Sequence, residues 1–431
     1  MKTNYYHKII FLIIFASTCI SLKAQDVTLP IDLKTVLKLA GANNLTIHEY
    51  QLKYQSALAD ETRSKEWWLP VIYAGASTHY LNGSAMNTDG KILTDLSRNN
   101  FWTGLGVAAE IDFARGKYET LAANQRAEAS RFYSDAEKNQ IVLSAVHTYL
   151  ELQAGQQKYL LLQDLVLRAD TLSQQIKTKS DVGLLYESDY LLSQSNFNHL
   201  KVLMLQADAE RQKHSAHLVR ILNIDELILL ISIDSALVPL TMSMPVTDTL
   251  TFKNRPEYSG LVAELESSQT LRTRADRGMF QPKLRVGLEN GAFGAIINSI
   301  HNTFQFNATL LWQIPLSRII SKGDLKKMDV EILLRQNDIA QFENQYRMET
   351  SIARAQILNA QQQMSIANQA LSSATEALNQ ALARQNLGTA KPFEVFQAQE
   401  FVLRAQVDLV HAITEYNKAQ FTLKVARGET L

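Results

Sequence analysis

The stretch Trp67-Trp68-Leu69-Pro70 is followed by a short segment of alternating apolar and polar residues, a loop, a second such segment and a long run with helical periodicity. The same order recurs after Met279-Phe280-Gln281-Pro282. Each long run ends at a glycine turn, Gly183 in the first copy and Gly388 in the second, and a returning helix follows. Self-similarity of this kind predicts an internal duplication, in which each half carries two short strands attached to long helices.

The spacing of helix-breaking residues predicts an elongated shape. The chain has 431 residues but only eight prolines, all at expected junctions between elements. Neither glycine nor proline occurs from Asp324 to Leu387. At a rise of 1.5 Å per residue, that run alone predicts a helix about 95 Å long. A rod of this length does not fit inside a compact globule.

The N-terminus is typical of a secretory signal peptide. Lys2 and Lys8 lie around its start, residues 9–20 are apolar, and Ala24 supplies the small residue at which cleavage is expected. The only cysteine, Cys19, lies inside this segment. Lipidation of Cys19 is the alternative, but Thr18 stands where lipid attachment favours a small residue. We therefore expect a signal peptide over residues 1–24 and a mature chain without disulfides.

The composition argues against several classes of function. The formal net charge is zero, with 43 basic and 43 acidic residues and no basic block, so nothing indicates nucleic-acid binding. No apolar stretch after the signal is long enough to cross a bilayer as a helix. The chain contains no phosphate loop, nucleophile elbow or zinc-ligand spacing, so we expect neither enzyme activity nor a cofactor.

Two pairs of residues are weak candidates for metal binding. His214 and His217 lie about one turn apart on a predicted helix, where such histidines are usually exposed to solvent. Met242 and Met244 would offer only two thioether ligands, from an interrupted loop. We therefore expect no metal site.

Four segments alternate with a period of two residues: 71–81, 101–112, 283–289 and 303–314. Alternate side chains of a strand point to opposite faces, so each segment predicts one face suited to lipid and one suited to water. In the last segment, Phe304, Phe306, Ala308, Leu310, Trp312 and Ile314 share the apolar face. The residues expected to line a water-filled lumen are Lys283, Arg285, Glu289, Gln305 and Asn307.

The tryptophans fall at the edges of these hairpins or within them. They are Trp67, Trp68, Trp102 and Trp312, and there are no others. Their placement is typical of the aromatic girdle of outer-membrane barrels. The alternative is a soluble sandwich of four half-buried strands with tryptophan in its core, but nothing else in the chain could form a second sheet to cover them.

Four strands cannot close a barrel, and an open sheet edge is not tolerated in lipid. Closure therefore requires several chains. Two chains would supply eight strands, with an interior filled by side chains, whereas three would supply twelve and leave a water-filled lumen. The polar faces favour the second arrangement. We expect a homotrimer in which each chain contributes four strands to a shared twelve-stranded β-barrel.

The long helices follow the alternating three- and four-residue spacing of coiled coils. The seam of the second long run is Ile357, Ala360, Met364, Ala367, Leu371, Ala374, Leu378 and Ala381. The seam of the returning helix is Val402, Ala405, Leu409, Ala412, Tyr416, Ala419, Leu423 and Ala426. Between Tyr346 and Ile357 the spacing slips, and such a stutter locally unwinds the supercoil. These seams are compatible with helices packed side by side in the wall of a cylinder. The helical pattern alone would be equally compatible with a solid rod.

The chain resembles the TolC family of outer membrane efflux proteins. The resemblance rests on the opening helix with Leu33, Val36 and Asn43-Asn44, on Pro70 and Pro282 before the strands, and on Asn254-Arg255-Pro256-Glu257-Tyr258 at the start of the second half. Two turns add to it: Val182-Gly183-Leu184 with Asp189, and Leu387-Gly388-Thr389 with Glu394. The resemblance covers essentially the whole mature chain in order.

This resemblance implies a mainly α fold with a small β part: a trimeric channel-tunnel with a long coiled-coil α-barrel below the β-barrel. It also implies a periplasmic adaptor (membrane fusion) protein and an inner-membrane pump of the RND or ABC type as partners. The residues of the two turns, 182–184 with Asp189 and 387–389, would be the adaptor-docking tips. The implied localisation is the outer membrane of a Gram-negative bacterium, with the helices extending into the periplasm.

The resemblance further implies a periplasmic gate just after the second turn. The matching positions, six and nine residues after Gly388, are Glu394 and Gln397. The family pattern has an acidic residue at both, so Gln397 departs from it and leaves the role of that position open. A ring of three Glu394 carboxylates would attract cations at a narrow point. The alternative is that Glu394 only caps the helix that follows Pro392.

We therefore expect a signal peptide over 1–24, a first repeat over 25–222, an equatorial segment over 223–252 and a second repeat over 253–431. Each repeat would hold a helix, a β-hairpin (near 70–112 and 283–314) and long helices (113–222 and 318–427). The expected function is a passive exit duct of a tripartite efflux or type I secretion system. The alternative is a periplasmic structural or adaptor-like coiled-coil protein without a pore.

Overall fold

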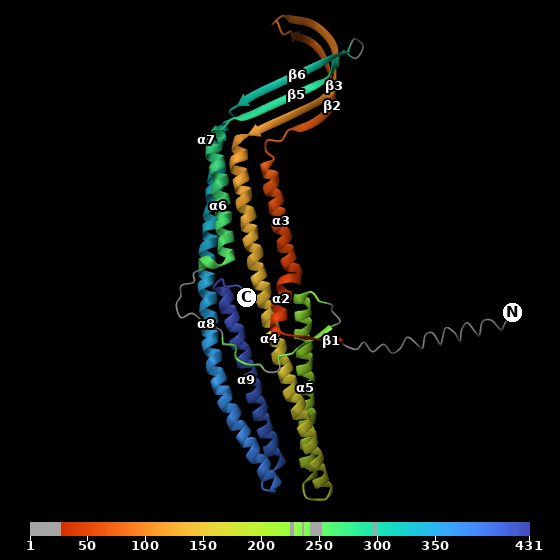
Figure 1. Cartoon of the computed structure of the whole chain (residues 1–431), viewed down its shortest axis with the longest axis vertical. Helices are drawn as coiled ribbons and strands as arrows, with labels where there is room; N and C mark the ends of the chain where they lie inside the picture. The colour runs from red at the N-terminus through yellow and green to blue at the C-terminus, as the bar shows by residue number, and fades with distance from the viewer. Residues whose placement is uncertain (1–26, 225–227, 235–236, 242–251, 296–299) are drawn as a thin grey trace, which may run out of the picture.

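The computed structural model describes residues 27–224, 228–234, 237–241, 252–295 and 300–431. The predicted signal peptide, Cys19, Met242 and Met244 lie outside these residues. Long helices run along the molecule, and a four-stranded sheet lies at one end of them (Figure 1).

Two long helical hairpins make up most of the chain. The first is α4 (Thr120–Asp181) with α5 (Glu187–Leu222), and the second is α8 (Gly323–Asn386) with α9 (Pro392–Ala426). With 62 and 64 residues, α4 and α8 are about 93 and 96 Å long. The long glycine- and proline-free run is thus one helix, as its sequence predicted.

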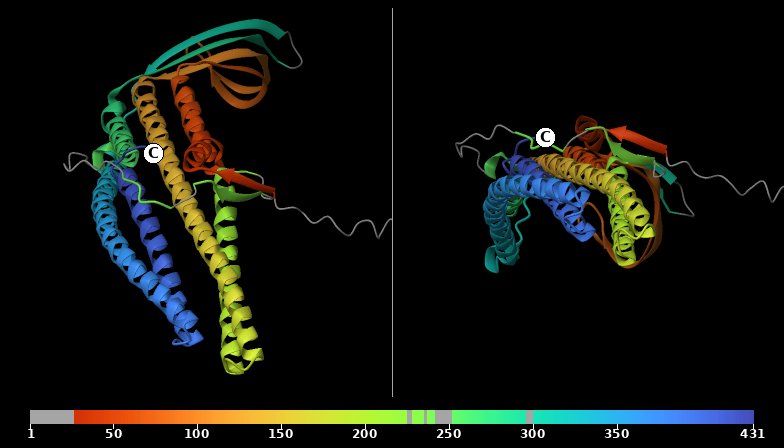
Figure 2. Two further views of the ribbon diagram at one scale, coloured as in Figure 1. Left: turned by 60° about the horizontal axis from the view of Figure 1, so that its bottom comes forward. Right: turned by 90° about the horizontal axis from the view of Figure 1, so that it is seen from below.

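Shorter helices complete the layer. α3 (Leu45–Lys65) continues the line of α5 toward the sheet, and α6 (Pro256–Arg277) continues that of α9 (Figure 1). α4 contacts α3, α5, α6 and α9, while α8 contacts α6 and α9. α8 therefore lies along one side of the layer and α3 with α5 along the other, and the view from below shows the hairpins side by side (Figure 2). The remaining short helices are α2 (Leu33–Asn43), α7 (Leu316–Ile320), and the single turns η1 (Arg115–Glu119), η2 (Phe252–Asn254) and η3 (Gly278–Phe280).

The predicted coiled-coil seam of the second hairpin is confirmed. Ala360 and Ala367 of α8 are buried, as are Ala412 and Ala419 of α9. Ala353 and Ile357 pack with Ala419 and Leu423 in one apolar cluster. Alanine at these positions lets the two helices approach closely along a narrow stripe. No helix in the described part of the chain has both the length and the hydropathy to cross a membrane.

The large sheet is antiparallel throughout, in the order β2-β3-β5-β6. Its strands are β2 (Val71–Met86), β3 (Ile92–Asp112), β5 (Lys283–Gly294) and β6 (Ile300–Leu311). Each strand was predicted, but β2, β3 and β5 extend further from the helices than their alternation indicated. β6 ends at Leu311 rather than at residue 314, because Leu311 pairs with Lys283, the first residue of β5 after Pro282.

A small second sheet lies beside the middle of the helices. β1 (Val27–Ile31) pairs in parallel with β4 (Ile228–Ser232). Leu230 of β4 is fully buried, and Ile31 of β1 packs in the same apolar cluster as Val36, Tyr149 and Leu218. The apolar stretch at residues 229–233 was expected to lie in an equatorial segment, whereas its partner β1 was not predicted.

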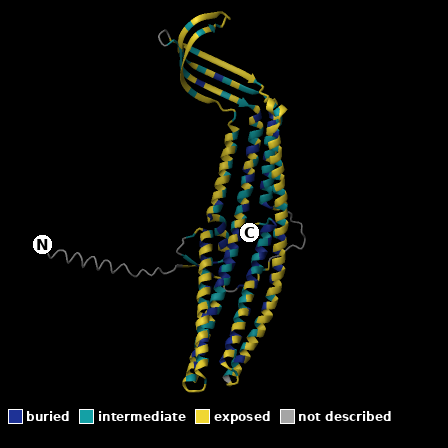
Figure 3. Cartoon of the chain, turned by 180° about the vertical axis from the view of Figure 1, so that it is seen from behind, coloured by how far each residue is buried: buried dark blue, intermediate teal, exposed yellow. Residues whose placement is uncertain are grey.

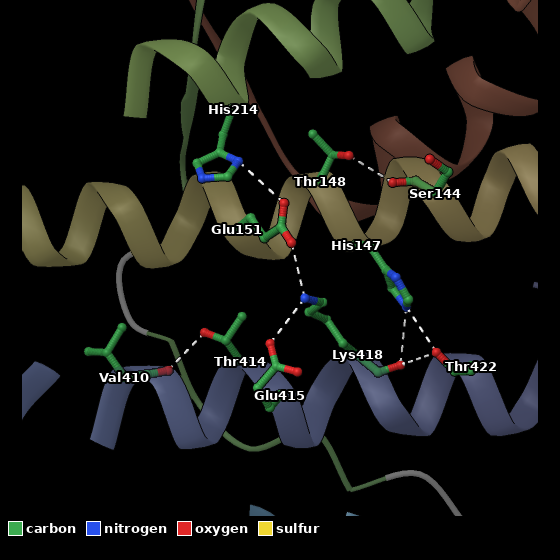
Figure 4. A network of polar contacts seen from close by, with 10 residues as sticks. All are labelled: Ser144, His147, Thr148, Glu151, His214, Val410, Thr414, Glu415, Lys418 and Thr422. Carbon is green, nitrogen blue, oxygen red and sulfur yellow. Dashed lines mark hydrogen bonds and ion pairs between the residues drawn. The ribbon is translucent and has the colours of Figure 1, made fainter. Parts of the chain in front are cut away.

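A polar network joins the two halves of the chain near the middle of α4 (Figure 4). Lys418 on α9 donates from Nζ to Glu151 on α4 at 3.0 Å and to Glu415 at 3.0 Å. Glu151 also pairs with His214 on α5, with 3.3 Å between Nδ1 and Oε2. Three helices from both halves thus meet at one carboxylate.

Two histidines of this region have lowered pKa values, so their neutral form is favoured. His147, one turn before Glu151, has its Nε2 atom 3.1 Å from Thr422 Oγ1 and 3.3 Å from the carbonyl oxygen of Lys418. Burial, and then the charge of Lys418, lower the pKa of His147. Burial also lowers the pKa of His214, against the opposing effect of Glu151.

We expect the folded chain to lose stability in mild acid. A histidine in the unfolded chain has a pKa of about 6.5, so the unfolded chain binds protons before the folded chain does. The stability that these neutral histidines contribute is therefore present above about pH 6.5 and is lost as the pH falls through the lower folded pKa. Melting temperatures between about pH 5 and pH 8, measured by circular dichroism, should show this loss. His147→Gln should reduce the pH dependence, whereas the same change at the exposed His48 should not. An identical pH dependence in both variants would contradict the prediction.

Candidate channel wall and helix tips

The two long hairpins end in the same turn. Gly183, with φ of 77°, and Gly388, with φ of 74°, are in the left-handed region. At the first tip the amide of Leu184 donates to the carbonyl of Lys179 at 2.8 Å, and at the second the amide of Thr389 donates to that of Arg384 at 2.9 Å. Both tips are therefore Schellman motifs, in which glycine avoids the strain that a side chain would meet.

The carboxylates six residues after each glycine occupy matching positions. Asp189 accepts from the amide of Tyr186 at 3.4 Å, and Glu394 accepts from that of Lys391 at 3.3 Å. Each is the third residue of its helix and accepts from the backbone amide of the residue just before the helix, which is one half of a capping box. Glu394 therefore caps its helix, as the alternative interpretation predicted. Its second oxygen also pairs with Arg384 at 3.1 Å, a partner that sequence reasoning missed. Gln397 is exposed, one turn further along α9.

Large apolar side chains at both tips are exposed. In the first tip, Leu184 is 74% exposed, and Val182 and Tyr186 are exposed as well. In the second, Leu387 is 78% exposed, and Phe393 is exposed as well. Side chains of this kind, clustered at the end of a rod, are typical of a surface that contacts another protein.

The strand register brings the predicted lumen residues onto one face of the sheet. Glu289 pairs with Gly106 of β3 and with Gln305 of β6, and Asn307 pairs with Gly287. Directly paired residues point to the same side of a sheet. Lys283, Arg285, Glu289, Gln305 and Asn307 therefore share a polar face. On it, Arg285 Nε donates to Glu110 at 2.9 Å and Lys283 Nζ lies 3.1 Å from Asp112.

The opposite face is apolar, and exposed residues run along all four strands (Figure 3). Phe304 is 67% exposed and Phe306 is 63% exposed, on the outer strand β6. Ile72 of β2, Leu105 of β3 and Leu288 of β5 belong to the same face and are exposed too. Exposed apolar rows of this extent on a sheet indicate a surface that water does not cover in the working protein.

Glycines allow the sheet to bend toward its polar face. A Cβ atom on Gly104 would lie 2.7 Å from the Cα atom of Gly291 on the neighbouring strand. A Cβ on Gly106 would overlap the ring of Tyr73, and one on Gly287 would overlap the side chain of Asn307. Backbones and side chains thus approach most closely on the polar face, which a sheet curved around that face requires.

The four tryptophans do not share one environment. Trp68 and Trp312 are exposed, with Trp312 just after the end of β6. Trp67 instead packs on Gly116 of η1 and meets Phe113 edge to face, with 6.0 Å between ring centroids. Trp102 pairs with Ser77 and Phe293, which places it on the polar face. Only Trp68 and Trp312 therefore have the outward exposure that a membrane girdle needs.

The two long sides of the molecule have free strand edges and exposed apolar side chains. β2 and β6 each have a neighbour on one side only, so their outer backbone groups have no strand partner in the described part of the chain. Exposed apolar side chains also follow the two outermost helical columns. On α8 they are Val330, Leu333, Leu334, Leu358 and Ile366; on α3 and α5 they are Leu45, Leu52, Leu58, Leu191, Leu192, Val202 and Leu205.

Comparison with known proteins shows a likeness in structure rather than in sequence. No family model matches the chain, and no curated protein matches it in sequence. A membrane protein from Pseudomonas aeruginosa superposes with a TM-score of 0.78 at 18% identity, over 95% of this chain and 96% of that one. The CmeC outer membrane channel of Campylobacter jejuni gives 0.74 at 17% identity, over 92% and 85%.

The outer membrane protein VceC of Vibrio cholerae gives a TM-score of 0.74 at 15% identity, over 92% of this chain and 96% of that one. At such identities the likeness establishes the fold. The predicted architecture, mainly α with a small antiparallel part, is confirmed. The chain has the channel-tunnel fold of outer-membrane proteins such as CmeC and VceC.

Proposed function

We propose that three copies of this chain form an outer membrane channel-tunnel, which serves as a passive exit duct for substrates delivered from the inner membrane. The observation that carries this proposal is the sheet. It has an exposed apolar face, a polar face toward which glycines let it bend, and two unpaired edges. A curved wall of this kind suits lipid outside and water inside.

The unpaired edges support assembly from identical chains. β6 of one chain would pair with β2 of the next, and α8 would pack against α3 and α5 of the same neighbour. Contact between two different surfaces closes into a ring when the rotation between neighbours allows it. Twelve strands leave a water-filled lumen, whereas eight would be filled by side chains. The polar face favours a homotrimer.

The helix tips support partners in the periplasm. Val182 and Leu184 of one tip and Leu387 of the other are exposed on a rod, far from the strands. We infer that these tips, with Gly183, Gly388, Thr389 and Asp189, receive a periplasmic adaptor that links the tunnel to an inner-membrane pump of the RND or ABC type. The fold of the structural neighbours, several of which are described as outer membrane channels, supports the same assignment.

The mass of the protein extracted in mild detergent from the outer membrane fraction tests the assembly. We expect a trimer, with a heat-sensitive shift on gel electrophoresis, because the shared sheet would make the three chains inseparable until they unfold. A monomer in the soluble periplasm would instead support the coiled-coil alternative without a pore.

The orientation of the sheet can be tested with neighbouring residues of β6. Phe306→Lys should place a charge in lipid, at a cost of about 2–4 kcal/mol near the middle of the membrane, and should sharply reduce the trimer recovered from outer membranes. Asn307→Lys is the matched control, since it puts the same charge on the polar face, and its trimer yield should match the wild type. Equal yields for the two variants would contradict an apolar face in lipid.

The gate assignment of Glu394 can be separated from its capping role by comparison with Asp189. Glu394→Gln and Asp189→Asn should each cost about 0.3–1 kcal/mol of stability, because each weakens one helix cap. Only Glu394→Gln should also lower the cation preference of single channels in planar bilayers, if the three carboxylates face the mouth of the tunnel. Unchanged selectivity in that variant would remove Glu394 from the gate. If Asp189→Asn lowered the cation preference as well, the selectivity could not be assigned to the second tip alone.

A further inference from the structure

The charged residues at the base of the polar face form closed pairs. Arg285 of β5 is paired with Glu110 of β3, and Lys283 of β5 with Asp112 of β3. Lys283 also lies 3.7 Å from Glu110. Two bases thus face two acids across the β3–β5 ladder. This part of the wall presents no net charge to a solute that passes it.

Glu289, higher on β5, has a different environment. In the described part of the chain, its hydrogen-bond partner is the hydroxyl of Tyr73, which donates to Oε1. A neutral phenol can orient a carboxylate but does not cancel its charge. Gly106 and Gln305, the residues paired with Glu289 on the adjacent strands, carry no charge either.

The bases on the same face are too far away to neutralise Glu289. Arg285 lies four residues back along β5, about 14 Å at the rise of a strand. His301, which pairs with Phe293, lies four residues from Gln305 along β6, about 14 Å by the same measure, and Arg98 on β3 is farther still. All these separations exceed the Debye length of about 8 Å at physiological ionic strength. Glu289 is therefore a locally unbalanced negative charge.

Tyr73 fixes the position of this charge. Its side chain starts on β2 and reaches across β3 to the carboxylate on β5. The ring lies over Gly106, which is buried, and any side chain at that position would overlap the ring. Glycine at residue 106 thus creates the path by which Tyr73 reaches Glu289. Three consecutive strands contribute to holding one carboxylate.

We propose that Glu289 is a selectivity residue of the barrel: three Glu289 carboxylates, each oriented by Tyr73, form a ring that favours cations over anions within the lumen. The proposal rests on the trimeric channel proposed above. The ring would be separate from the periplasmic mouth and from Glu394, at the opposite end of the helices. Cationic solutes would pass this level of the wall more readily than anionic ones.

Reversal potentials of purified trimers in planar bilayers, under a potassium chloride gradient, test the ring. Glu289→Gln should lower the cation-to-anion permeability ratio by about two- to fivefold, the range expected for loss of a nearby charge in water. Gln305→Lys should have a similar effect, because it places a base beside an intact Glu289. Gln305→Ala, the matched control, should leave the ratio unchanged.

Two further variants test the geometry. Arg285→Gln should raise the ratio, since it removes one positive charge from the polar face and leaves Glu110 with only the more distant Lys283. Tyr73→Phe should lower the ratio with Glu289 intact, because the carboxylate loses the hydroxyl that orients it. An unchanged ratio in this variant would show that Tyr73 does not position the ring. An unchanged ratio in Glu289→Gln, with normal trimers and conductance, would overturn the proposed ring while leaving the channel in place. Monomers in place of trimers in the outer membrane fraction would overturn both proposals.

Discussion

The constraint on which the rest of the structure depends is the unpaired backbone along the outer edges of β2 and β6. A free sheet edge presents rows of N–H and C=O groups that require partners, and lipid offers none. In the proposed assembly each edge finds its partner on a neighbouring chain. The helical layer has matching exposed apolar side chains on α8 at one side and on α3 and α5 at the other. A single rotation between neighbouring chains would therefore pair the free strand edges and also bury the exposed apolar side chains of the helices.

Curvature and lumen chemistry are linked through the same residues. Gly104 and Gly291 let the strands approach on the polar face, and Gly106 leaves room for the ring of Tyr73. A wall that bends toward one side brings the side chains of that side together, so bulky residues there must be few or must lie flat. Tyr73 lies flat because Gly106 permits it. The glycines thus shape the wall and also determine which polar groups reach the water it encloses.

Strong local patterns gave correct strand and helix assignments, and weak ones did not. The alternation in β5 and β6 and the uninterrupted run of α8 are local signals, and the structure contains all three elements. The outer parts of β2 and β3 mix polar and apolar residues without alternation, so their length could not be predicted. β1 is five residues long and acquires its role only by pairing with β4, about 200 residues away.

The site residues show the same division. The capping position of Glu394 follows from its spacing from Pro392, so it could be predicted, whereas its ion pair with Arg384 depends on how two helices meet. Trp102 was expected in a girdle because it lies within a hairpin, but the register places it with Ser77 on the polar face. Tyr73 was missed because residues 71–81 alternate only weakly. Which face a residue occupies is set by its partner strand, which the local sequence does not contain.

The two tips show how a duplicated backbone can serve different purposes. Both have a basic residue at the last turn, a left-handed glycine and a capping carboxylate in the same positions. Their surfaces nevertheless differ nine residues after the glycine, where the first tip has the exposed Leu192 and the second has the exposed Gln397. Burial of an exposed leucine against a partner protein is energetically favourable, whereas a glutamine side chain is well solvated by water. The first tip is therefore better suited to a protein contact at this level, and the second to a water-filled mouth.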